Sequence, residues 1–234
     1  MAMRPPPEPS RPGRPCILAM NHVVLLGDSI FDNAAYVAGG PDVIRQLREA
    51  LPPGWRATLL AVDGAATAGV PAQLRRMPAD ATHAVVSVGG NDALQAAGVL
   101  GQAARSVAEA VEMLARVGDQ FERAYGTMLE AVLAAGRPTA LCTIYYPRYP
   151  DPVQQRLGVT GLMLFNDVIT RAAFARGLPL LDLRLICDRD EDYANPIEPS
   201  VRGGAKISAA ISRLLAEHDF GRRRTEVFVR GEGR

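Results

Sequence analysis

Lysine is almost absent from this sequence, because Lys206 is the only lysine among 26 lysine and arginine residues. Covalent chemistry through a lysine amine therefore has a single candidate. The cysteines Cys16, Cys142 and Cys187 are odd in number and widely spaced. This spacing gives neither a disulfide framework nor a paired metal-binding motif. Free cysteines are typical of reducing compartments, so we expect a cytoplasmic protein.

Strong charge and long apolar runs are also missing. The formal net charge is +1 at pH 7, so no large electrostatic field attracts nucleic acid or anionic lipid. No uninterrupted apolar run reaches the length of about 18 residues that a transmembrane helix requires. We therefore expect no nucleic-acid partner and no membrane partner. The 234 residues suffice for one α/β domain with a substantial core.

The composition divides the chain into three segments. Residues 1–19 are rich in proline and lack periodicity, which predicts an extended or disordered segment. Residues 20–217 carry the alternating patterns of a folded domain. Residues 218–234 form a C-terminal tail with three consecutive arginines and the short β-like run TEVFVR. That run is either part of a loose tail or an added edge strand.

Apolar runs alternate with helical patterns along the domain. Helix spacing relates Phe165, Val168, Ile169 and Ala172, and it recurs in the last helix at Ile207, Ile211, Leu214 and Leu215. The alanine-rich stretch 103–135 predicts two helices broken near Gly118. Strands alternating with helices indicate βαβ units and a parallel sheet. The expected strands are 22–27, 57–62, 83–89, 139–145 and 178–183.

Each expected strand ends in a polar or glycine-containing turn. In a parallel sheet these turns meet at the carboxyl edge, where open α/β sheets bind ligands. Ser29 follows the first strand directly, so it is a candidate for display at this edge. The turns are Gly27-Asp28-Ser29, Asp63-Gly64-Ala65, Gly89-Gly90-Asn91-Asp92, Tyr145–Pro152 and Cys187–Ser200.

The GDSI sequence after the first strand, Gly64 after the second and GGND after the third resemble the SGNH/GDSL hydrolases. The resemblance extends from Val23 to Leu215. It implies a three-layer α/β/α sandwich with a five-stranded parallel, flavodoxin-like sheet. It also implies that Ser29 is the nucleophile. The N–H groups of Ser29 and Gly64 and the side-chain amide of Asn91 would form the oxyanion hole.

The chemistry of these residues agrees with the resemblance. A serine nucleophile requires a neighbouring base and hydrogen-bond donors fixed where the oxyanion forms. Asn91 supplies a donor that cannot ionise. Gly64 allows the backbone to approach a substrate without a Cβ in the way.

The sequence departs from the family where the catalytic aspartate and histidine are expected. These two positions hold Asn195 and Glu198. His22 and His83 begin strands, which places His22 roughly 20 Å from Ser29 at about 3.3 Å per residue. His218 follows the last helix, where it would meet the exposed carbonyl groups of the helix end. None of the three is expected at the catalytic edge.

Two interpretations follow from this departure. In the first, Glu198 is the base, with a pKa raised by burial or by nearby negative charge, and Asn195 helps to orient it. Asp192 is a possible second carboxylate. In the second, Ser29 remains but the protein is an acyltransferase or a non-hydrolytic ligand-binding protein. We favour the first, a serine ester hydrolase that acts on small or medium acyl esters.

Further residues near the predicted edge could contact a substrate. Tyr145, Tyr146 and Arg148 follow the fourth strand, and Asp28 precedes Ser29. Asp28 and Asp32 flank the serine without a spaced set of metal ligands. We therefore expect a small-molecule ester substrate, with no cofactor and no metal. The oligomeric state is not encoded in these patterns.

Overall fold

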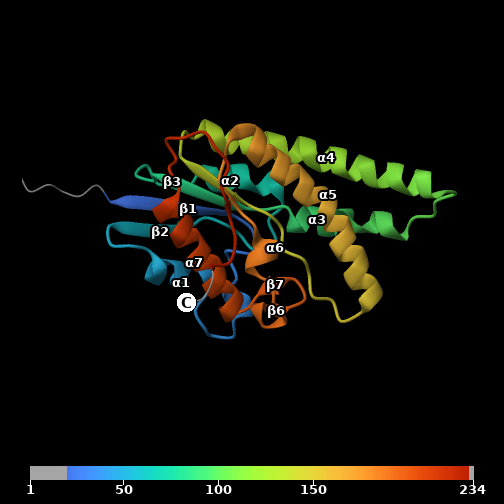
Figure 1. Ribbon diagram of the computed structural model, residues 1–234, viewed down its shortest axis with the longest axis horizontal. Coiled ribbons are helices and arrows are strands. Elements are labelled where there is room, and N and C mark those ends of the chain that lie inside the picture. The colour runs from blue at the N-terminus through green and yellow to red at the C-terminus, as the bar shows by residue number, and fades with distance from the viewer. Residues whose placement is uncertain (1–19, 232–234) are drawn as a thin grey trace, which may run out of the picture.

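The computed structural model describes residues 20–231, which form a three-layer arrangement around a parallel sheet (Figure 1). The strand order β2-β1-β3-β4-β5-β8 extends the flavodoxin-like order 2-1-3-4-5, and all five pairings are parallel. The α/β prediction is confirmed, with six strands instead of five. The strands are β1 (Asn21–Gly27), β2 (Trp55–Leu59), β3 (His83–Ser87), β4 (Thr139–Cys142), β5 (Leu180–Leu181) and β8 (Val227–Phe228).

Helices cover both faces of the sheet. On one face lie α1 (Val43–Ala50), α6 (Leu183–Ile186) and α7 (Val201–Glu217), and on the other lie α2 (Val70–Leu74), α4 (Val107–Ala134) and α5 (Pro152–Arg176). Shorter elements complete the connections. These are η1 (Ala34–Tyr36), η2 (Thr67–Gly69), α3 (Gly90–Ala96), η3 (Ala97–Gly101), η4 (Asp190–Asp192), and the strands β6 (Tyr193–Asn195) and β7 (Glu198–Pro199).

The central strand β1 directs apolar side chains to both faces of the sheet, so helices must cover both faces. Its apolar residues are continuous, and alternate side chains of a strand point to opposite faces of the sheet. Val23 and Leu25 pack with α1 and α7, whereas Val24 and Leu26 pack with α4 and α5. All four are fully buried, so β1 is held rigidly at the middle of the sheet and fixes where its carboxyl end lies.

The helix α4 is one continuous helix, where the sequence predicted two. The predicted break near Gly118 is wrong, because α4 continues from Val107 to Ala134. A glycine inside a helix costs only about 1 kcal/mol relative to alanine. Burial of Phe121, Tyr125 and Met128 against α5 and the sheet offsets that cost.

The segment after α7 joins the sheet. β8 pairs with β5 in parallel register, Leu181 opposite Phe228, so the run TEVFVR supplies an edge strand. The tail is held further by His218, which contacts Glu226 at 2.5 Å. The expectation for residues 1–19 lies outside the described residues.

The helix α5 is unusually apolar. It is the one helix within residues 20–231 that is long and apolar enough to cross a membrane by length and composition alone, and 28% of its most apolar window is buried. Core helices of folded proteins can pass the same test. Phe165, Val168 and Ile169 of α5 are buried against the sheet and α4.

Candidate active site

Ser29 lies in the turn that directly follows β1, at the carboxyl edge of the sheet. Gly27 ends the strand with φ +126°, and a Cβ at this position would overlap the carbonyl oxygen of Ser87. Only glycine fits this conformation and this approach. The N–H of Asp28 donates to the same Ser87 oxygen at 3.1 Å. The chain therefore turns sharply and presents Ser29, which is 7% exposed.

A buried glutamine fixes the end of β1. Gln73 of α2 accepts a hydrogen bond from the N–H of Gly27 at 2.8 Å and donates one to its carbonyl oxygen at 2.7 Å. The amide bonds both backbone groups of Gly27 on the side where β2 has already ended. Gln73 is 3% exposed. The sequence does not identify Gln73 as a site residue, because no neighbouring residue distinguishes it from an ordinary helical glutamine.

Glu198 is brought to Ser29 from the far end of the chain. The Oγ of Ser29 donates a hydrogen bond to Oε1 of Glu198 at 3.0 Å. Glu198 is 6% exposed, and its Oε2 has no hydrogen-bond partner among the described residues. A nucleophile and an acceptor within hydrogen-bond reach are the first requirement for base-assisted attack.

The environment of Glu198 makes its carboxylate a stronger base than an ordinary glutamate. Burial and, to a smaller extent, the charge of Asp63 raise the pKa of Glu198 to about 7, although the hydrogen bond from Ser29 lowers it. Burial acts in this direction because a charged carboxylate loses its hydration inside the protein. The group therefore titrates near neutral pH.

A tight turn holds Glu198 in place. Oδ1 of Asn195 accepts hydrogen bonds from the N–H groups of Ile197 at 2.9 Å and Glu198 at 3.0 Å. Asn195 thus contacts the backbone N–H of Glu198 and not its carboxylate. The hydroxyl of Tyr145 donates to the carbonyl of Ile197 at 2.7 Å, and Asn33 Nδ2 donates to that of Pro199 at 3.1 Å. Both sides of Glu198 are therefore anchored.

The proposed oxyanion donors come from two neighbouring loops. Asn91 lies in the first turn of α3, and its Nδ2 donates to the carbonyl oxygen of Ala65 at 3.0 Å. Its second amide hydrogen remains available to a ligand. Gly64 precedes Ala65 and has φ +76°, a backbone conformation that favours glycine. The structure therefore joins the loop that contains Gly64 to Asn91, which lines the cavity, whereas Gly64 itself is not part of the lining.

A second contact ties these loops together. The N–H and the hydroxyl of Thr67 donate to the carboxylate of Asp92 at 3.0 and 2.7 Å. Asp92 therefore links the loop after β2 to α3 and fixes the spacing of Gly64 and Asn91. Among the described residues, no group of three or more His, Cys, Asp and Glu side chains is arranged to hold a metal ion.

Asp28 is a second carboxyl group with a raised pKa. It is 3% exposed and accepts a hydrogen bond from the N–H of Ile30 at 3.2 Å. Burial, together with the charges of Glu198 and Asp92, raises the pKa of Asp28 to about 8, although the Ile30 hydrogen bond opposes the rise. A protonated Asp28 is therefore the main form at pH 7.

The three histidines lie away from Ser29. His22 is fully buried, and its ring contacts Thr58 at 2.8 Å and Asp80 at 3.3 Å. His83 packs against the Trp55 ring, and His218 follows α7. None of them lines the cavity that contains Ser29.

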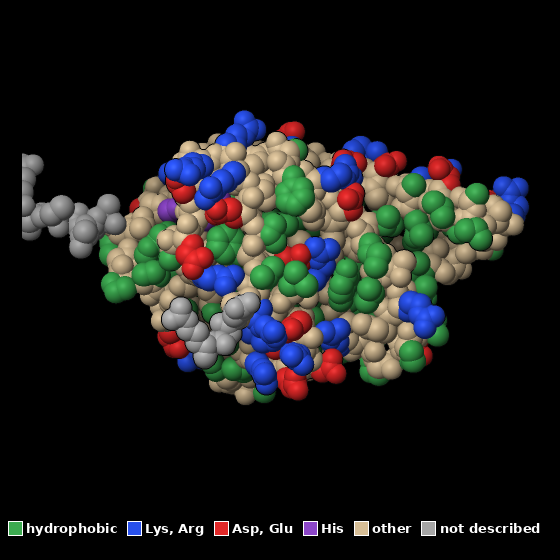
Figure 2. Space-filling view, viewed as in Figure 1, with side chains coloured by type: hydrophobic (Ala, Val, Ile, Leu, Met, Phe, Trp, Pro, Cys, Tyr) green, Lys and Arg blue, Asp and Glu red, His purple; other side chains and the backbone are tan. Residues whose placement is uncertain are grey.

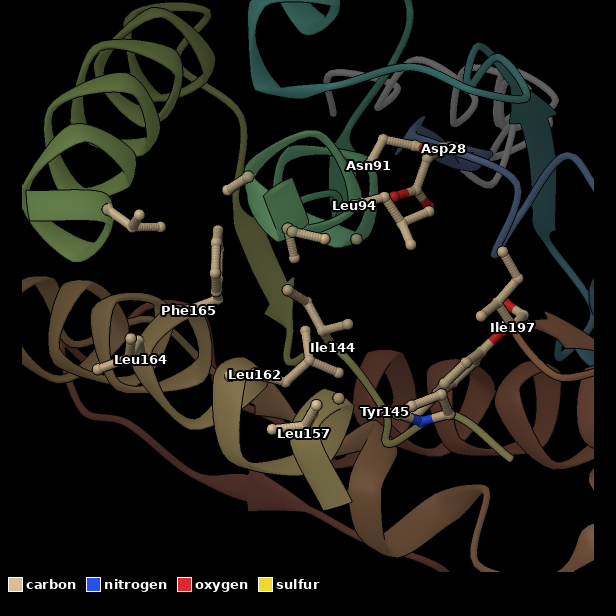
Figure 3. A pocket seen from close by; sticks show the side chains of 18 of the residues that line it. Asp28, Asn91, Leu94, Ile144, Tyr145, Leu157, Leu162, Leu164, Phe165 and Ile197 are labelled. Carbon is tan, nitrogen blue, oxygen red and sulfur yellow. Dashed lines mark hydrogen bonds between the residues drawn. The ribbon is translucent and has the colours of Figure 1, made fainter. Parts of the chain in front are cut away.

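Ser29 and Glu198 both line a cavity of about 150 Å³. Figure 3 shows Asp28, Asn91, Ile197 and Tyr145 on one side of this space and Leu157, Leu162, Leu164 and Phe165 on the other. The apolar part of the lining comes mainly from α3, η3, α4 and α5, with Ile144 from the loop after β4. It includes Leu94, Ala97, Leu100, Leu114, Val117, Ile144, Leu157, Leu162 and Phe165.

Three predicted residues have other positions. Arg148 and Tyr146 do not line the cavity, whereas Asp28 and Tyr145 do. The N–H of Arg148 donates to the carbonyl of Pro196 at 2.8 Å, and the Tyr146 carbonyl accepts from Tyr193 at 2.8 Å. These contacts attach both residues to the segment around Glu198, and their role as substrate contacts stays a prediction. Asp192 is fully buried and pairs with Lys206 at 2.6 Å, not with Glu198.

The fold and its polar carboxyl edge place the chain in the flavodoxin-like class of α/β proteins with a candidate serine site. Residues 25–206 match the GDSL-like Lipase/Acylhydrolase family. The chain therefore belongs to this family, which confirms the resemblance seen in the sequence. Membership supports ester hydrolysis as the general activity. No curated protein matches the chain.

Solved structures show the same fold at low sequence identity. An extracellular lipase from Streptomyces rimosus is 16% identical with a TM-score of 0.59, and the alignment covers 85% of this chain and 100% of that one. A phospholipase A1 from Streptomyces albidoflavus is 15% identical with a TM-score of 0.57, covering 86% and 100%. The esterase EstA from Pseudoalteromonas is 18% identical with a TM-score of 0.54, covering 84% and 100%.

Proposed function

We propose that the protein is a serine hydrolase of carboxylic esters with small or medium acyl groups, and that Ser29 and Glu198 act as its nucleophile and base. The observation that carries the proposal is the 3.0 Å hydrogen bond from Ser29 Oγ to Glu198 Oε1. It joins a serine displayed at the carboxyl edge to a buried carboxylate. This arrangement supports a catalytic dyad without histidine.

The reaction divides into two half-reactions. Ser29 Oγ attacks the ester carbonyl carbon while its proton passes to Glu198 Oε1. The tetrahedral intermediate expels the alcohol, which takes the proton from Glu198, and an acyl-serine remains. Water then gives its proton to Glu198 and attacks the acyl-serine. Collapse of the second intermediate releases the acid, and the proton returns to Ser29.

The oxyanion of each intermediate requires fixed donors. We assign this role to the N–H groups of Ser29 and Gly64 and to the free amide hydrogen of Asn91. One such donor is typically worth about 3–4 kcal/mol in transition-state stabilisation. The Thr67–Asp92 hydrogen bonds support the assignment because they hold both loops before substrate arrives.

The raised pKa gives glutamate the proton affinity that the missing histidine would have supplied. A shift from 4.5 to about 7 corresponds to about 3 kcal/mol of added proton affinity. At neutral pH about half of the Glu198 side chains are ionised and able to accept the serine proton. An ordinary exposed glutamate would be a much weaker base.

The cavity supports an acyl group as the buried part of the substrate. Its apolar lining, which includes Ile144, Leu157 and Phe165, matches a hydrocarbon chain better than a sugar or a charged group. The buried, mainly protonated Asp28 adds little negative charge at pH 7. Tyr145 contributes its ring to the lining while its hydroxyl is bonded to the Ile197 carbonyl.

Hydrolysis of p-nitrophenyl acetate, butyrate and octanoate tests the proposal, with Ser29→Ala as the blank. We expect a rate that depends on Ser29, with a lower KM for butyrate than for acetate as the apolar lining is filled. A rate equal to the Ser29→Ala blank for all three esters would reject hydrolysis. It would leave an acyltransferase or a ligand-binding protein on the same fold.

A further inference from the structure

Six exposed apolar side chains surround one end of the molecule. They are Leu94 and Leu100 from α3 and η3, Val107 and Val111 from α4, and Val153 and Leu157 from α5, and we call them the apolar collar. Their exposed fractions range from 45% to 82%. Figure 2 shows hydrophobic side chains gathered toward the end where α4 begins. Isolated exposed apolar residues are ordinary, but a contiguous group indicates a binding surface.

The collar continues the lining of the cavity along α4. Val107, Val111 and Leu114 follow one another at helix spacing, so they share one face of the helix. Leu114 lines the cavity, whereas Val107 is 82% and Val111 58% exposed. The apolar face that contacts the cavity therefore extends into solvent.

The same continuity is present on α5 and on the α3–η3 segment. Val153 and Leu157 are separated by one helical turn, and Leu157 lines the cavity while Val153 is 65% exposed. Leu94 and Leu100 line the cavity and are also about half exposed. Three separate elements thus bring apolar surface to the same opening.

We propose that the apolar collar docks on the surface of a lipid aggregate, so that an ester enters the cavity from the lipid phase. This proposal departs from the expectation of no membrane partner, which rested on the net charge and on the lack of a transmembrane run and not on the exposed surface. The inference rests on the proposed function, because it concerns how that substrate arrives. An acyl chain that moves directly from lipid into an apolar cavity need not cross water. Exposed apolar side chains at the opening would be buried among lipid at the same time.

Local charge indicates the kind of lipid surface. Near the start of α4, Arg105 pairs with Glu109 at 3.1 Å and Arg116 pairs with Glu112 at 3.2 Å. On α5 the exposed Asp151 and Arg156, which flank Val153, also carry opposite charges, so the charges beside the collar sum to about zero. Docking should therefore depend on apolar contact and not on anionic lipid, which agrees with the net charge near zero. A surface of zwitterionic lipid fits this chemistry.

A second copy of the chain fits the collar less well. Two collars facing each other would close both cavity openings and exclude the substrate. A lipid surface covers the same residues and supplies the substrate through the opening. Dimerisation through the collar is therefore an alternative that the test must separate.

The test uses vesicles of ether-linked phosphatidylcholine, which contain no ester to hydrolyse. The Val107→Ser/Val111→Ser/Val153→Ser variant removes collar residues that do not line the cavity. Its matched control, Phe174→Ser/Leu185→Ser/Val227→Ser, removes three apolar residues of 48–55% exposure elsewhere. Phe174 lies roughly 30 Å from Val153 along α5, at about 1.5 Å per residue.

Flotation of the protein with the vesicles gives the partition coefficient. We expect the collar variant to lose about tenfold or more in partitioning, because three valines no longer enter the lipid. The control variant should bind like the unmodified protein, and 0.5 M salt should change binding less than twofold. Hydrolysis of soluble p-nitrophenyl butyrate should be the same in both variants.

Three results would overturn the proposal. These are no vesicle binding by the unmodified protein, equal loss in both variants, or a collar-dependent dimer in sedimentation without vesicle binding. The proposed function is judged separately, by the Ser29-dependent rate on soluble butyrate ester. A protein that hydrolyses the soluble ester and ignores vesicles would contradict the collar proposal alone.

Discussion

Replacement of Glu198 by glutamine tests the dyad with little change in shape. The amide keeps the size of the side chain and retains an oxygen that can accept the hydrogen bond now 3.0 Å from Ser29 Oγ. It cannot accept and hold the serine proton. General-base catalysis contributes about 10²- to 10⁴-fold, so we expect kcat for p-nitrophenyl butyrate to fall by that factor.

The pH dependence adds a second, independent expectation. In the proposed dyad the ionised form of Glu198 is the base, so the rate should be low in acid and rise with pH. Because burial raises the pKa of Glu198 to about 7, the midpoint of kcat/KM should lie near pH 7. A free glutamate would give a midpoint near 4.5. In Glu198→Gln this ionisation should vanish from the profile.

The matched control is Glu191→Gln. Glu191 lies in the same segment as Glu198, between α6 and α7, but its side chain is exposed. The same chemical change at Glu191 should therefore leave the rate and the pH profile unaltered. Circular dichroism and thermal unfolding would show that both variants fold. A folded Glu198→Gln variant with a rate within threefold of the unmodified protein would refute the role of Glu198 as base.

Three further predictions concern the surrounding residues. Asn91→Ala should lower kcat by about 10²- to 10³-fold at similar KM in the ester assay, because one oxyanion donor is lost. Gly27→Ala should abolish cooperative thermal unfolding, since its Cβ overlaps the Ser87 carbonyl and φ is +126°. Asp28→Asn should raise the melting temperature relative to the unmodified protein, by a margin that grows between pH 4 and pH 8. The sign follows because the pKa of Asp28 is near 3.8 in the unfolded chain and about 8 in the folded protein. Between these two values the unfolded chain releases the proton more readily, so the unmodified protein loses stability as the pH rises, whereas Asp28→Asn does not. A margin that stays constant with pH would contradict a raised pKa for Asp28.

The carboxyl edge of the sheet could be predicted because its signals are local. An apolar run that ends in glycine and polar residues marks a buried strand and the turn after it, and parallel strands gather these turns together. Ser29 and Asn91 were therefore placed on one edge from sequence alone. Glu198 was found by its position before the last helix, and the structure puts it in hydrogen-bond contact with Ser29.

The features that could not be predicted depend on contacts between distant segments. Gln73 bonds to Gly27, and nothing near Gln73 in the sequence indicates this pairing. β8 is only two residues long, and its pairing with β5 is set by the packing of the tail. The continuity of α4 through Gly118 is likewise decided by burial against α5 and the sheet, which outweighs local propensity.

The directions of the side chains in the loop after β4 could not be predicted from the sequence either. Four candidates there and beside Ser29 were equally suitable as substrate contacts, yet only Tyr145 and Asp28 line the cavity. Arg148 turns away to the Asp188 carbonyl at 3.0 Å. Asn195 likewise binds backbone N–H groups of the turn and not the carboxylate of Glu198. In an irregular loop no periodicity tells which face a residue occupies.

The most direct test of the Ser29–Glu198 dyad is the rate of covalent labelling by a fluorophosphonate as a function of pH, with the adduct mapped by mass spectrometry. The dyad predicts one adduct, on Ser29, formed at a rate that rises with pH around a midpoint near 7 and that falls sharply in Glu198→Gln. An unlabelled folded protein, or labelling of Ser29 that is unaffected by Glu198→Gln, would contradict it.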